Sequence, residues 1–595
     1  MASPEVVWSS ELSDDTASSP SRRVQELLAL CFSSLESGRF QELESSVKEL
    51  VNCLNSLSEE ENEALDSSNE LENDVIQVLA EILKFVSSPQ IDQAVIDALS
   101  FELLKVISKF ANVSRRCLQL VDEIVDRFVE VCNPRDMLSI LCEALDAARS
   151  SLSPSSCSTP LLHGLSKVFT LVLRRHYEQL RVAVPIVMNV LKGMSQETNV
   201  QVKDVFDKAL GIAVSIQDVS SKLKNEENAK VRCLLGLYVM QITAIISISI
   251  RDKVASSYVP LVMQLEPFLT YCSLTHLGLI TGNDTEKLMS TVAGENVDVV
   301  SSFPDIKLGA SLLFIWAKIS HEASEVPNAA LGNDVEELQS NPVKRWQAYG
   351  MLKYILSSGD LPWEFQRHTI ELLLDVTKGV TSSQCNNEQI DCSDYTPSIY
   401  AALQAVTLLM MSAPDAGLRK KTFEALKRVL SDIPASERFD ILRALVTNSQ
   451  SPSMTAILLG LVKDNMSKSS LQATDMHIIE LVELVLKPSQ GGPPLLPDQG
   501  DAVLAALNLY RFALLFESRA GKERSRGDSE VLSKKNLEKA YKEWLLPLRT
   551  IVSAENLKEE HGQEPSLDTL CVLNPIEMAL HHCIELVEEQ LKSQS

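Results

Sequence analysis

Apolar and polar residues alternate along most of the chain with the spacing of an α-helix. In the segment 24–35, apolar side chains recur three or four residues apart, which places them on one face of a helix. They are Val24, Leu27, Leu28, Cys31 and Leu35. The segments 75–86, 101–113 and 118–132 repeat this pattern with short polar joints between them. The pattern therefore predicts a long succession of amphipathic helices.

Three segments share a more specific pattern, in which a turn is followed by an apolar residue, a basic residue and an apolar helical stripe. The apolar and basic pairs are Val202-Lys203, Val231-Arg232 and Leu418-Arg419. In outline this is the second helix of a HEAT-type repeat, in which an acidic or Asn turn residue caps the helix and the basic residue bonds neighbouring turns. One repeat cannot bury its own apolar face, so repeats must stack. We therefore predict an all-α, irregular HEAT/armadillo-like helical-repeat solenoid, with an ordinary large all-α protein as the alternative.

Polar breaks divide the helical segments without an abrupt change in composition. These predicted loops lie at 150–160, 281–304, 321–342, 381–397, 487–500 and 520–533. Residues 1–22 are rich in Ser, Asp and Pro and are expected to form a disordered tail. We interpret residues 23–400 as N-terminal and central HEAT-like repeats, and residues 401–595 as C-terminal repeats that bind a partner. In the last helix, Asn574 is expected to cap and Pro575 to take the first helical position.

Composition supports the all-α prediction and limits the function. Glycine accounts for 21 of 595 residues. This is about half its usual frequency of ~7%, and strand-rich folds need more glycine for their tight turns. The net charge of −25 opposes general binding to nucleic acid or to an anionic membrane. The densest acidic segment, 59–74, is expected to be a solvated loop. The most apolar stretch, 234–250, is shorter than a membrane span and contains polar residues, so a helix buried on both sides is expected.

The cysteines and the amino-terminal segment do not fit a secreted or metal-binding protein. The 12 cysteines are scattered singly, without a Cys-x-x-Cys motif or zinc-ligand spacing. Residues 1–20 have neither the basic region nor the apolar core of a signal peptide. Free, mostly buried thiols in a reducing compartment are therefore expected.

No segment carries a recognisable catalytic or cofactor motif, so we predict no cofactor, no metal and no enzymatic activity. The sequence lacks glycine-rich phosphate loops, a nucleophile elbow and a His-Glu-x-x-His zinc motif. His581, His582 and Cys583 are adjacent on a predicted helix and point about 100° apart, so two solvent-facing histidines and one core thiol are expected. His176 and Tyr177 are interpreted as the end of a repeat helix. An enzyme without a recognisable motif is the alternative.

The C-terminal segments resemble the glomulin family. The resemblance is carried by AALNLYRFALLFESR at 505–519, LEKAYKEWLLPLRTIVSAENLKEE at 537–560 and NPIEMALHHCIELVEEQLK at 574–592. Upstream, the segment 164–192 looks like the plant branch of the family, the aberrant lateral root formation proteins. The resemblance runs from about residue 24 to 592 and lies in helix order, loop placement and scattered identities.

The resemblance implies a HEAT-like repeat protein whose C-terminal repeats bind the RING subunit of cullin-RING (SCF-type) E3 ubiquitin ligases. Those repeats cover the surface that the ubiquitin-conjugating enzyme, the E2, uses, and the ligase is inhibited by steric masking. In plants the family is needed for the pericycle divisions that begin lateral roots. We therefore expect a monomer of the nucleus and cytoplasm that contacts cullin only indirectly. A general HEAT-repeat scaffold or transport adaptor with a different cargo is the alternative.

The family has no short motif that assigns contact residues, so outward polar side chains of two C-terminal helices are taken as candidates. On residues 501–519 the predicted buried face consists of Val503, Leu507, Tyr510 and Leu514. On residues 534–551 it consists of Leu537, Tyr541, Trp544, Leu548 and Ile551. The outward candidates for partner binding are Asn508, Arg511, Lys535, Lys539, Lys542 and Glu543. For each of them an ordinary solvated surface is the alternative.

Overall fold

The computed structural model confirms the predicted all-α class, since helices are the only regular elements in the part of the chain that it describes. The described residues are 19–36, 40–63, 68–149, 154–197, 200–251, 255–293, 305–323, 329–379, 391–468, 475–487, 493–520, 531–557 and 567–594. Of the predicted tail, residues 20–22 open the first helix, and residues 1–18 lie outside the described residues.

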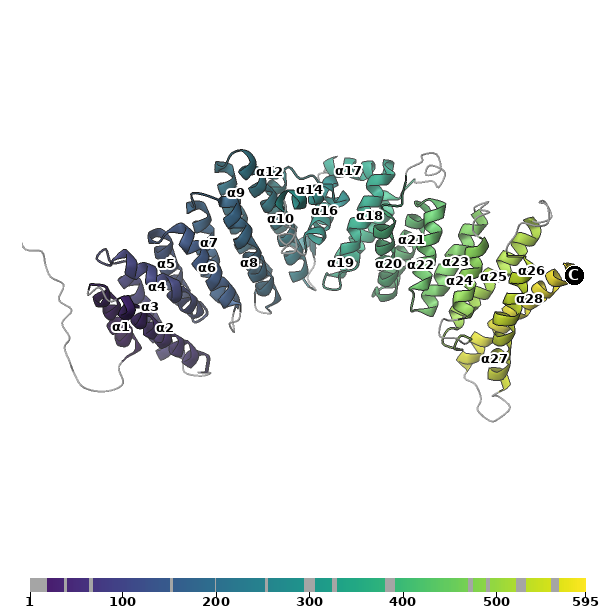
Figure 1. Ribbon diagram of the computed structural model, residues 1–595, viewed down its shortest axis with the longest axis horizontal. Helices are drawn as coiled ribbons and strands as arrows, with labels where there is room; N and C mark the ends of the chain where they lie inside the picture. The colour runs from purple at the N-terminus through teal and green to yellow at the C-terminus, as the bar shows by residue number, and fades with distance from the viewer. Residues whose placement is uncertain are drawn as a thin grey trace, which may run out of the picture. The chain divides into compact units, whose positions relative to one another are not determined.

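The chain forms two compact units. The first comprises Met1–Leu331 with Asp360–Phe365, and the second comprises Gly332–Gly359 with Gln366–Ser595. Within each unit, successive helices pack side by side (Figure 1). The functional division expected at residue 400 stays a prediction.

Of the helices up to residue 323, α1 to α10 form two rows. Their bounds are α1 (Pro20–Glu36), α2 (Phe40–Glu63), α3 (Ser68–Val86), α4 (Gln93–Ile107), η1 (Ser108–Asn112), α5 (Arg115–Val131), α6 (Pro134–Ala148), α7 (Pro154–Leu171), α8 (His176–Gln196), α9 (Val202–Lys222), α10 (Asn225–Ser249), η2 (Ala255–Tyr258), α11 (Val259–Val262), η3 (Met263–Leu265), α12 (Glu266–Tyr271), α13 (His276–Thr281), α14 (Asn283–Ala293) and α16 (Ile306–Ala323). The odd-numbered helices α1 to α9 contact one another in order, and so do the even-numbered helices α2 to α10. This two-row stack is the predicted repeat arrangement, in which each helix covers the apolar face of its neighbours.

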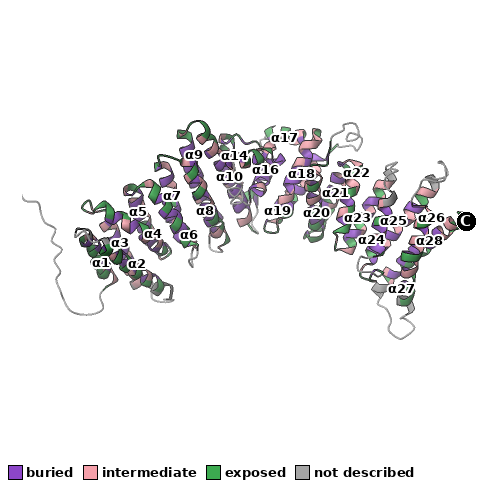
Figure 2. Cartoon of the chain, viewed as in Figure 1, coloured by how far each residue is buried: buried purple, intermediate pink, exposed green. Residues whose placement is uncertain are grey.

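The helices from residue 329 onward stack in a similar way. Their bounds are α17 (Ala329–Ser340), α18 (Pro342–Leu356), α19 (Trp363–Val376), α20 (Thr396–Ser412), α21 (Ala416–Ser431), α22 (Ala435–Thr447), α23 (Pro452–Lys468), α24 (Asp475–Leu486), α25 (Gly500–Ala520), α26 (Lys534–Lys539), the π-helix η4 (Ala540–Leu545), α27 (Leu546–Leu557) and α28 (Leu567–Ser593). Helix α18 packs on α20, α23 packs on α25, and α25 packs on α28. Figure 2 shows that buried residues lie along the helices in stripes, with exposed residues on other faces of the same helices.

Helix α10 confirms the prediction that the apolar stretch 234–250 is a helix buried on both sides. It packs against α8, α9, α14 and α16, and 83% of its most apolar window is inside the protein. This helix and Leu570–Ser593 of α28 are the two in the described part of the chain that are long and apolar enough to cross a membrane, and 39% of the second window is buried. Length and composition alone do not distinguish a core helix from a membrane span.

The apolar and basic pairs behave partly as predicted. Asp415 caps α21 by accepting a backbone N–H of the first turn at 2.7 Å. The residues before α9 and α10 make no such bond, so the capping prediction is wrong there; α10 begins early, at Asn225. Arg232 donates to the Tyr271 carbonyl and Arg419 to the Ala413 carbonyl. These two basic side chains therefore tie their helices to neighbouring turns.

The acidic segment 59–74 is mostly helical, so the prediction of a loop is wrong. Helix α2 continues to Glu63, and α3 already begins at Ser68. Glutamate is a good helix former, so a run of glutamates is compatible with a helix. A run of like charge therefore does not break a helix whose other face is buried.

Other predicted loops also contain helices. Helix α14 lies within 281–304, α17 lies within 321–342, and α7 begins at Pro154 inside 150–160. Each of the first two helices buries few apolar side chains, such as Leu288 in α14. Because few of their residues are apolar, these two segments resemble loops in composition, and the pattern of apolar residues did not predict them as helices.

The last helix begins earlier than predicted, which corrects the assignment of its cap. Helix α28 starts at Leu567, so Asn574 is inside it and Pro575 interrupts its interior. Leu573 in the added turns is only 1% exposed. Burial of this side chain contributes about 1.5–3 kcal/mol, which offsets much of the cost of a proline inside a helix.

Candidate partner-binding site

The core beneath the candidate surface is built from α25, η4 and α28. Val503, Leu507, Tyr510 and Leu514 of α25 are all buried, as predicted. Trp544 of η4 is 1% exposed, and its ring meets the Tyr510 ring edge-on at 5.8 Å between centroids. Aromatic contacts of this kind favour one packing arrangement of the two helices.

The π-helix η4 changes the predicted buried face of residues 534–551. Leu537, Trp544 and Leu548 are buried as expected, but Tyr541 and Ile551 are only half-buried. A π turn contains an extra residue, so it rotates the following side chains relative to a regular α-helix. The Tyr541 hydroxyl instead donates to Glu588 of α28 at 3.0 Å, and this hydrogen bond raises the pKa of Tyr541.

Two of the six candidate residues are engaged in ion pairs with the helix α24 region. Lys539 lies 2.8 Å from Glu483, and Glu543 lies 2.7 Å from Lys487. The bond to Lys487 lowers the pKa of Glu543, and the same bond raises the pKa of Lys487. The two pairs hold α26 and η4 against α24, so they have a structural role whether or not a partner binds.

The other candidates on these helices differ in their surroundings. Lys542 is exposed and lies 3.4 Å from Glu538, one turn earlier. Lys535 is exposed and Asn508 is half-buried. Within the described part of the chain, neither of these two side chains makes a hydrogen bond or an ion pair, so both can meet a partner without breaking an internal contact.

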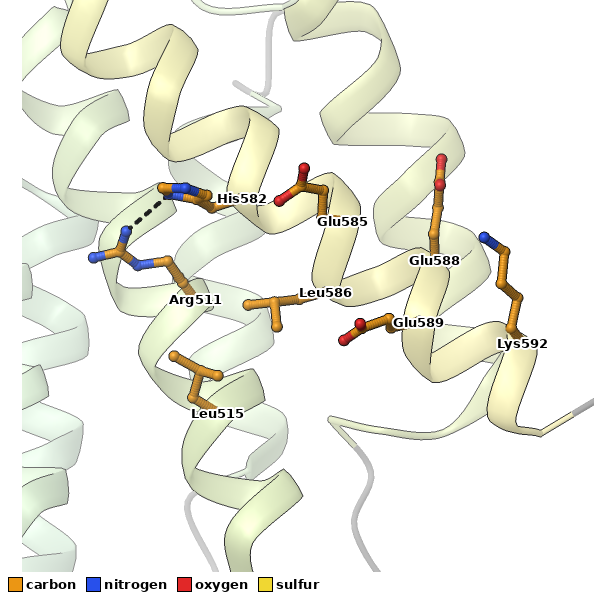
Figure 3. A pocket seen from close by; sticks show the side chains of 8 residues that line it. All are labelled: Arg511, Leu515, His582, Glu585, Leu586, Glu588, Glu589 and Lys592. Atoms are coloured by element: carbon orange, nitrogen blue, oxygen red, sulfur yellow. Dashed lines mark hydrogen bonds between the residues drawn. The ribbon is translucent and has the colours of Figure 1, made fainter.

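Arg511, the remaining candidate, lines an open groove of about 590 Å³ between α25 and α28 (Figure 3). The groove is lined by Arg511, Leu515, His582, Glu585, Leu586, Glu588, Glu589 and Lys592. Nη1 of Arg511 lies 3.4 Å from Nδ1 of His582. The groove therefore combines apolar side chains, carboxylates and cations within one surface depression.

Close packing of α25 on α28 fixes the walls of this groove. A Cβ at Gly500 would lie 2.2 Å from Val572, so the two helices meet there without room for a side chain. Further along, the Cys583 thiol donates to the Leu507 carbonyl at 3.4 Å, and burial raises the pKa of Cys583 to about 12. These two contacts follow the same order along both helices, so the helices run in the same general direction.

The histidines of α28 are placed as predicted. His581 and His582 are exposed and Cys583 is fully buried, so the three side chains do not converge on one point. The described cysteines are all free thiols, and most of them are buried. His176 and Tyr177 are the first two residues of α8, so they lie at the amino-terminal end of a repeat helix.

Sequence reasoning missed the α28 side of the groove. The apolar pattern of 574–592 contains no sign that α25 lies beside Glu588 and Glu589. The one available signal was spacing, since Glu585 and Glu589 are four residues apart and so share a face of the last helix. Which helix that face opposes depends on tertiary packing.

Comparison with known proteins agrees with the sequence resemblance. The family model described as YAP/Alf4/glomulin matches residues 34–583. The chain is similar to the Aberrant root formation protein 4 of Arabidopsis thaliana, with 77% identity over 594 residues that cover 98% of this chain and 94% of that protein. Among solved structures, it is similar to a circular tandem repeat protein at 15% identity and a TM-score of 0.28, covering 97% of this chain and 98% of that one. The family match spans more than half of the sequence, and the chain therefore belongs to the YAP/Alf4/glomulin family.

Proposed function

We propose that this chain is a non-enzymatic regulator that binds the RING subunit of cullin-RING ubiquitin ligases and masks their E2-binding surface. The observation that carries the proposal is the family match over residues 34–583, which includes α25, η4 and most of α28. The glomulin resemblance of these helices implies RING binding. The proposed contact surface is the outward side of α25, η4 and α28.

The chemistry of this surface supports binding by contact. These helices present exposed charged side chains, such as Lys535 and Glu589, and the partly exposed apolar side chains Leu515 and Phe516. A mixture of apolar and charged groups is typical of the interfaces of regulated complexes. Steric masking requires no nucleophile, cofactor or metal, because inhibition follows from occupancy alone. The net charge of −25 fits a protein partner better than nucleic acid or an anionic membrane.

The proposed cellular role follows from the relative. The similar Arabidopsis protein is named for aberrant root formation. We propose that this chain acts in root formation too, through control of cullin-RING ligases during the pericycle divisions that begin lateral roots. The proposal places a monomer in the nucleus and cytoplasm, where those ligases work.

A reconstituted ubiquitin-transfer assay tests the masking mechanism. The chain is added to a neddylated cullin-RING ligase at a concentration that halves the rate, and the E2 concentration is then raised. Masking is competitive, so saturating E2 is expected to restore the uninhibited rate. The control is a ligase-independent measurement of E2 charging by the activating enzyme, which the chain should not change.

Two results would contradict the proposal. Inhibition that persists unchanged at saturating E2 would exclude competition for one surface. Binding of the RING subunit without any effect on transfer would instead favour the scaffold or adaptor alternative.

A further inference from the structure

The groove between α25 and α28 has an apolar floor and an acidic rim. Leu515 of α25 and Leu586 of α28 line the floor, and Leu515 remains 39% exposed although the neighbouring Leu514 is 2% exposed. Figure 3 shows Leu586 pointing from α28 toward α25, with Glu589 extending on the same side. Apolar surface left open to water in a depression favours an occupant that covers it.

The carboxylates of the rim differ in how far they are already used. Glu588 accepts the hydrogen bond from the Tyr541 hydroxyl. Glu585 is exposed, and its neighbour His581 lies 3.8 Å away. Glu589 is exposed, and its carboxylate makes no ion pair or hydrogen bond with any residue that the structure describes. Glu585 and Glu589 therefore keep most of their capacity to accept hydrogen bonds from a partner.

The groove also contains two cations. Arg511 stands on the α25 wall beside His582. Lys592 follows Glu589 by three residues on α28, and in Figure 3 its side chain extends away from that of Glu589. The segment between them presents Glu585, Glu589 and the two leucines. An occupant that fits it has an apolar stem and a positively charged head, which describes arginine or lysine.

We infer that this groove receives an arginine or lysine side chain of the RING partner, with Glu585 and Glu589 pairing its charged head and Leu515 and Leu586 covering its stem. This inference rests on the proposed function. It assigns Arg511 to the opposite wall, where its charge disfavours the incoming cation. Glu585 and Glu589 therefore attract the partner's cation, whereas Arg511 on the other wall repels it.

A binding titration with the purified RING subunit in its cullin complex tests the inference. The double variant Glu585→Lys/Glu589→Lys is expected to weaken binding about tenfold or more. The variant Arg511→Glu is expected to tighten it. The matched control is Glu123→Lys/Glu178→Lys, which makes the same change of net charge at exposed positions of the first unit and should leave binding unchanged. Melting temperature is recorded for every variant, and Glu585→Gln/Glu589→Gln replaces the lysine variant if that one unfolds.

The outcomes separate this inference from the proposed function. If the wild type binds the RING subunit, and the lysine and glutamine variants of Glu585 and Glu589 bind it equally well, the inference is overturned. The proposed function then remains in place. Tighter binding by the lysine variant together with weaker binding by Arg511→Glu also overturns it, because the groove would then take an acidic side chain. A wild-type chain that does not bind the RING subunit at all rejects the proposed function and the inference with it.

Discussion

A buried ion pair between Arg345 and Asp432 holds α18 to the end of α21. Arg345 is 2% exposed and Asp432 is 0% exposed, and the guanidinium contacts both carboxylate oxygens. The Tyr349 hydroxyl also donates to Asp432, at 2.9 Å. Arg345 donates further to the carbonyls of Leu338 and Gln339, at 3.0 and 2.7 Å. Every polar group of the pair is thus satisfied inside the protein.

Removing one partner of this pair should cost more than removing both. Asp432→Asn leaves the arginine charge buried without its counterion, so the free energy of unfolding is expected to fall by about 3–5 kcal/mol. Arg345→Met/Asp432→Leu should lose less, and Tyr349→Phe about 1 kcal/mol. Guanidinium denaturation measures all three. A value for Asp432→Asn within about 0.5 kcal/mol of the wild type, the usual range of a surface change, would show that the pair is not isolated from water.

Single-residue contacts of this kind could not be predicted from the sequence. Periodicity correctly assigned Val503, Leu507 and Tyr510 to a buried face because that assignment needs only local spacing. Pairing Lys539 with Glu483 requires knowledge of which helices are neighbours. The sequence therefore named the outward residues of two helices, but not which of them bind internal partners and which face a groove.

At the scale of helices, α10 and α16 cross at a distance that excludes any side chain at Gly309. A Cβ there would lie 1.8 Å from the Met240 carbonyl oxygen of α10. Gly309→Ala is expected to destabilise the protein by about 1–3 kcal/mol or more, since the helices must move apart. Gly211 of α9 is the control because a Cβ there meets nothing within 4 Å. Gly211→Ala should stabilise by about 0.5–1 kcal/mol, and thermal denaturation of both variants checks the opposite signs. Equal effects of the two substitutions would contradict the close contact between α10 and α16 at Gly309.

Helix existence was easier to predict than helix ends or helix phase. Long amphipathic segments such as 75–86 gave helices because their apolar stripe alone specifies a buried face. Helix α28 began early because Leu573 is buried, and the π turn at 540–545 moved Tyr541 off the core. Both departures depend on tertiary packing, which the local pattern does not contain.

At the scale of the whole molecule, the two compact units allow stability and binding to be separated. Gly309 and the crossing of α10 with α16 belong to the first unit, whereas Trp544 belongs to the second. Trp544→Ala removes a large core side chain beside Tyr510 and should cost roughly 3–5 kcal/mol. Repeat arrays propagate stability mainly between neighbouring repeats, so each substitution should act chiefly within its own unit.

If partner binding belongs to the C-terminal repeats, these two variants must differ in a RING-binding titration. Gly309→Ala is expected to lower the melting temperature while leaving the dissociation constant near that of the wild type. Trp544→Ala should lower the melting temperature and weaken binding together, because Trp544 lies under the surface formed by α25, η4 and α28. The titration is run well below both melting temperatures, so that loss of binding does not merely report global unfolding. Weakened binding by Gly309→Ala with normal binding by Trp544→Ala would move the site out of residues 401–595 and into the first unit.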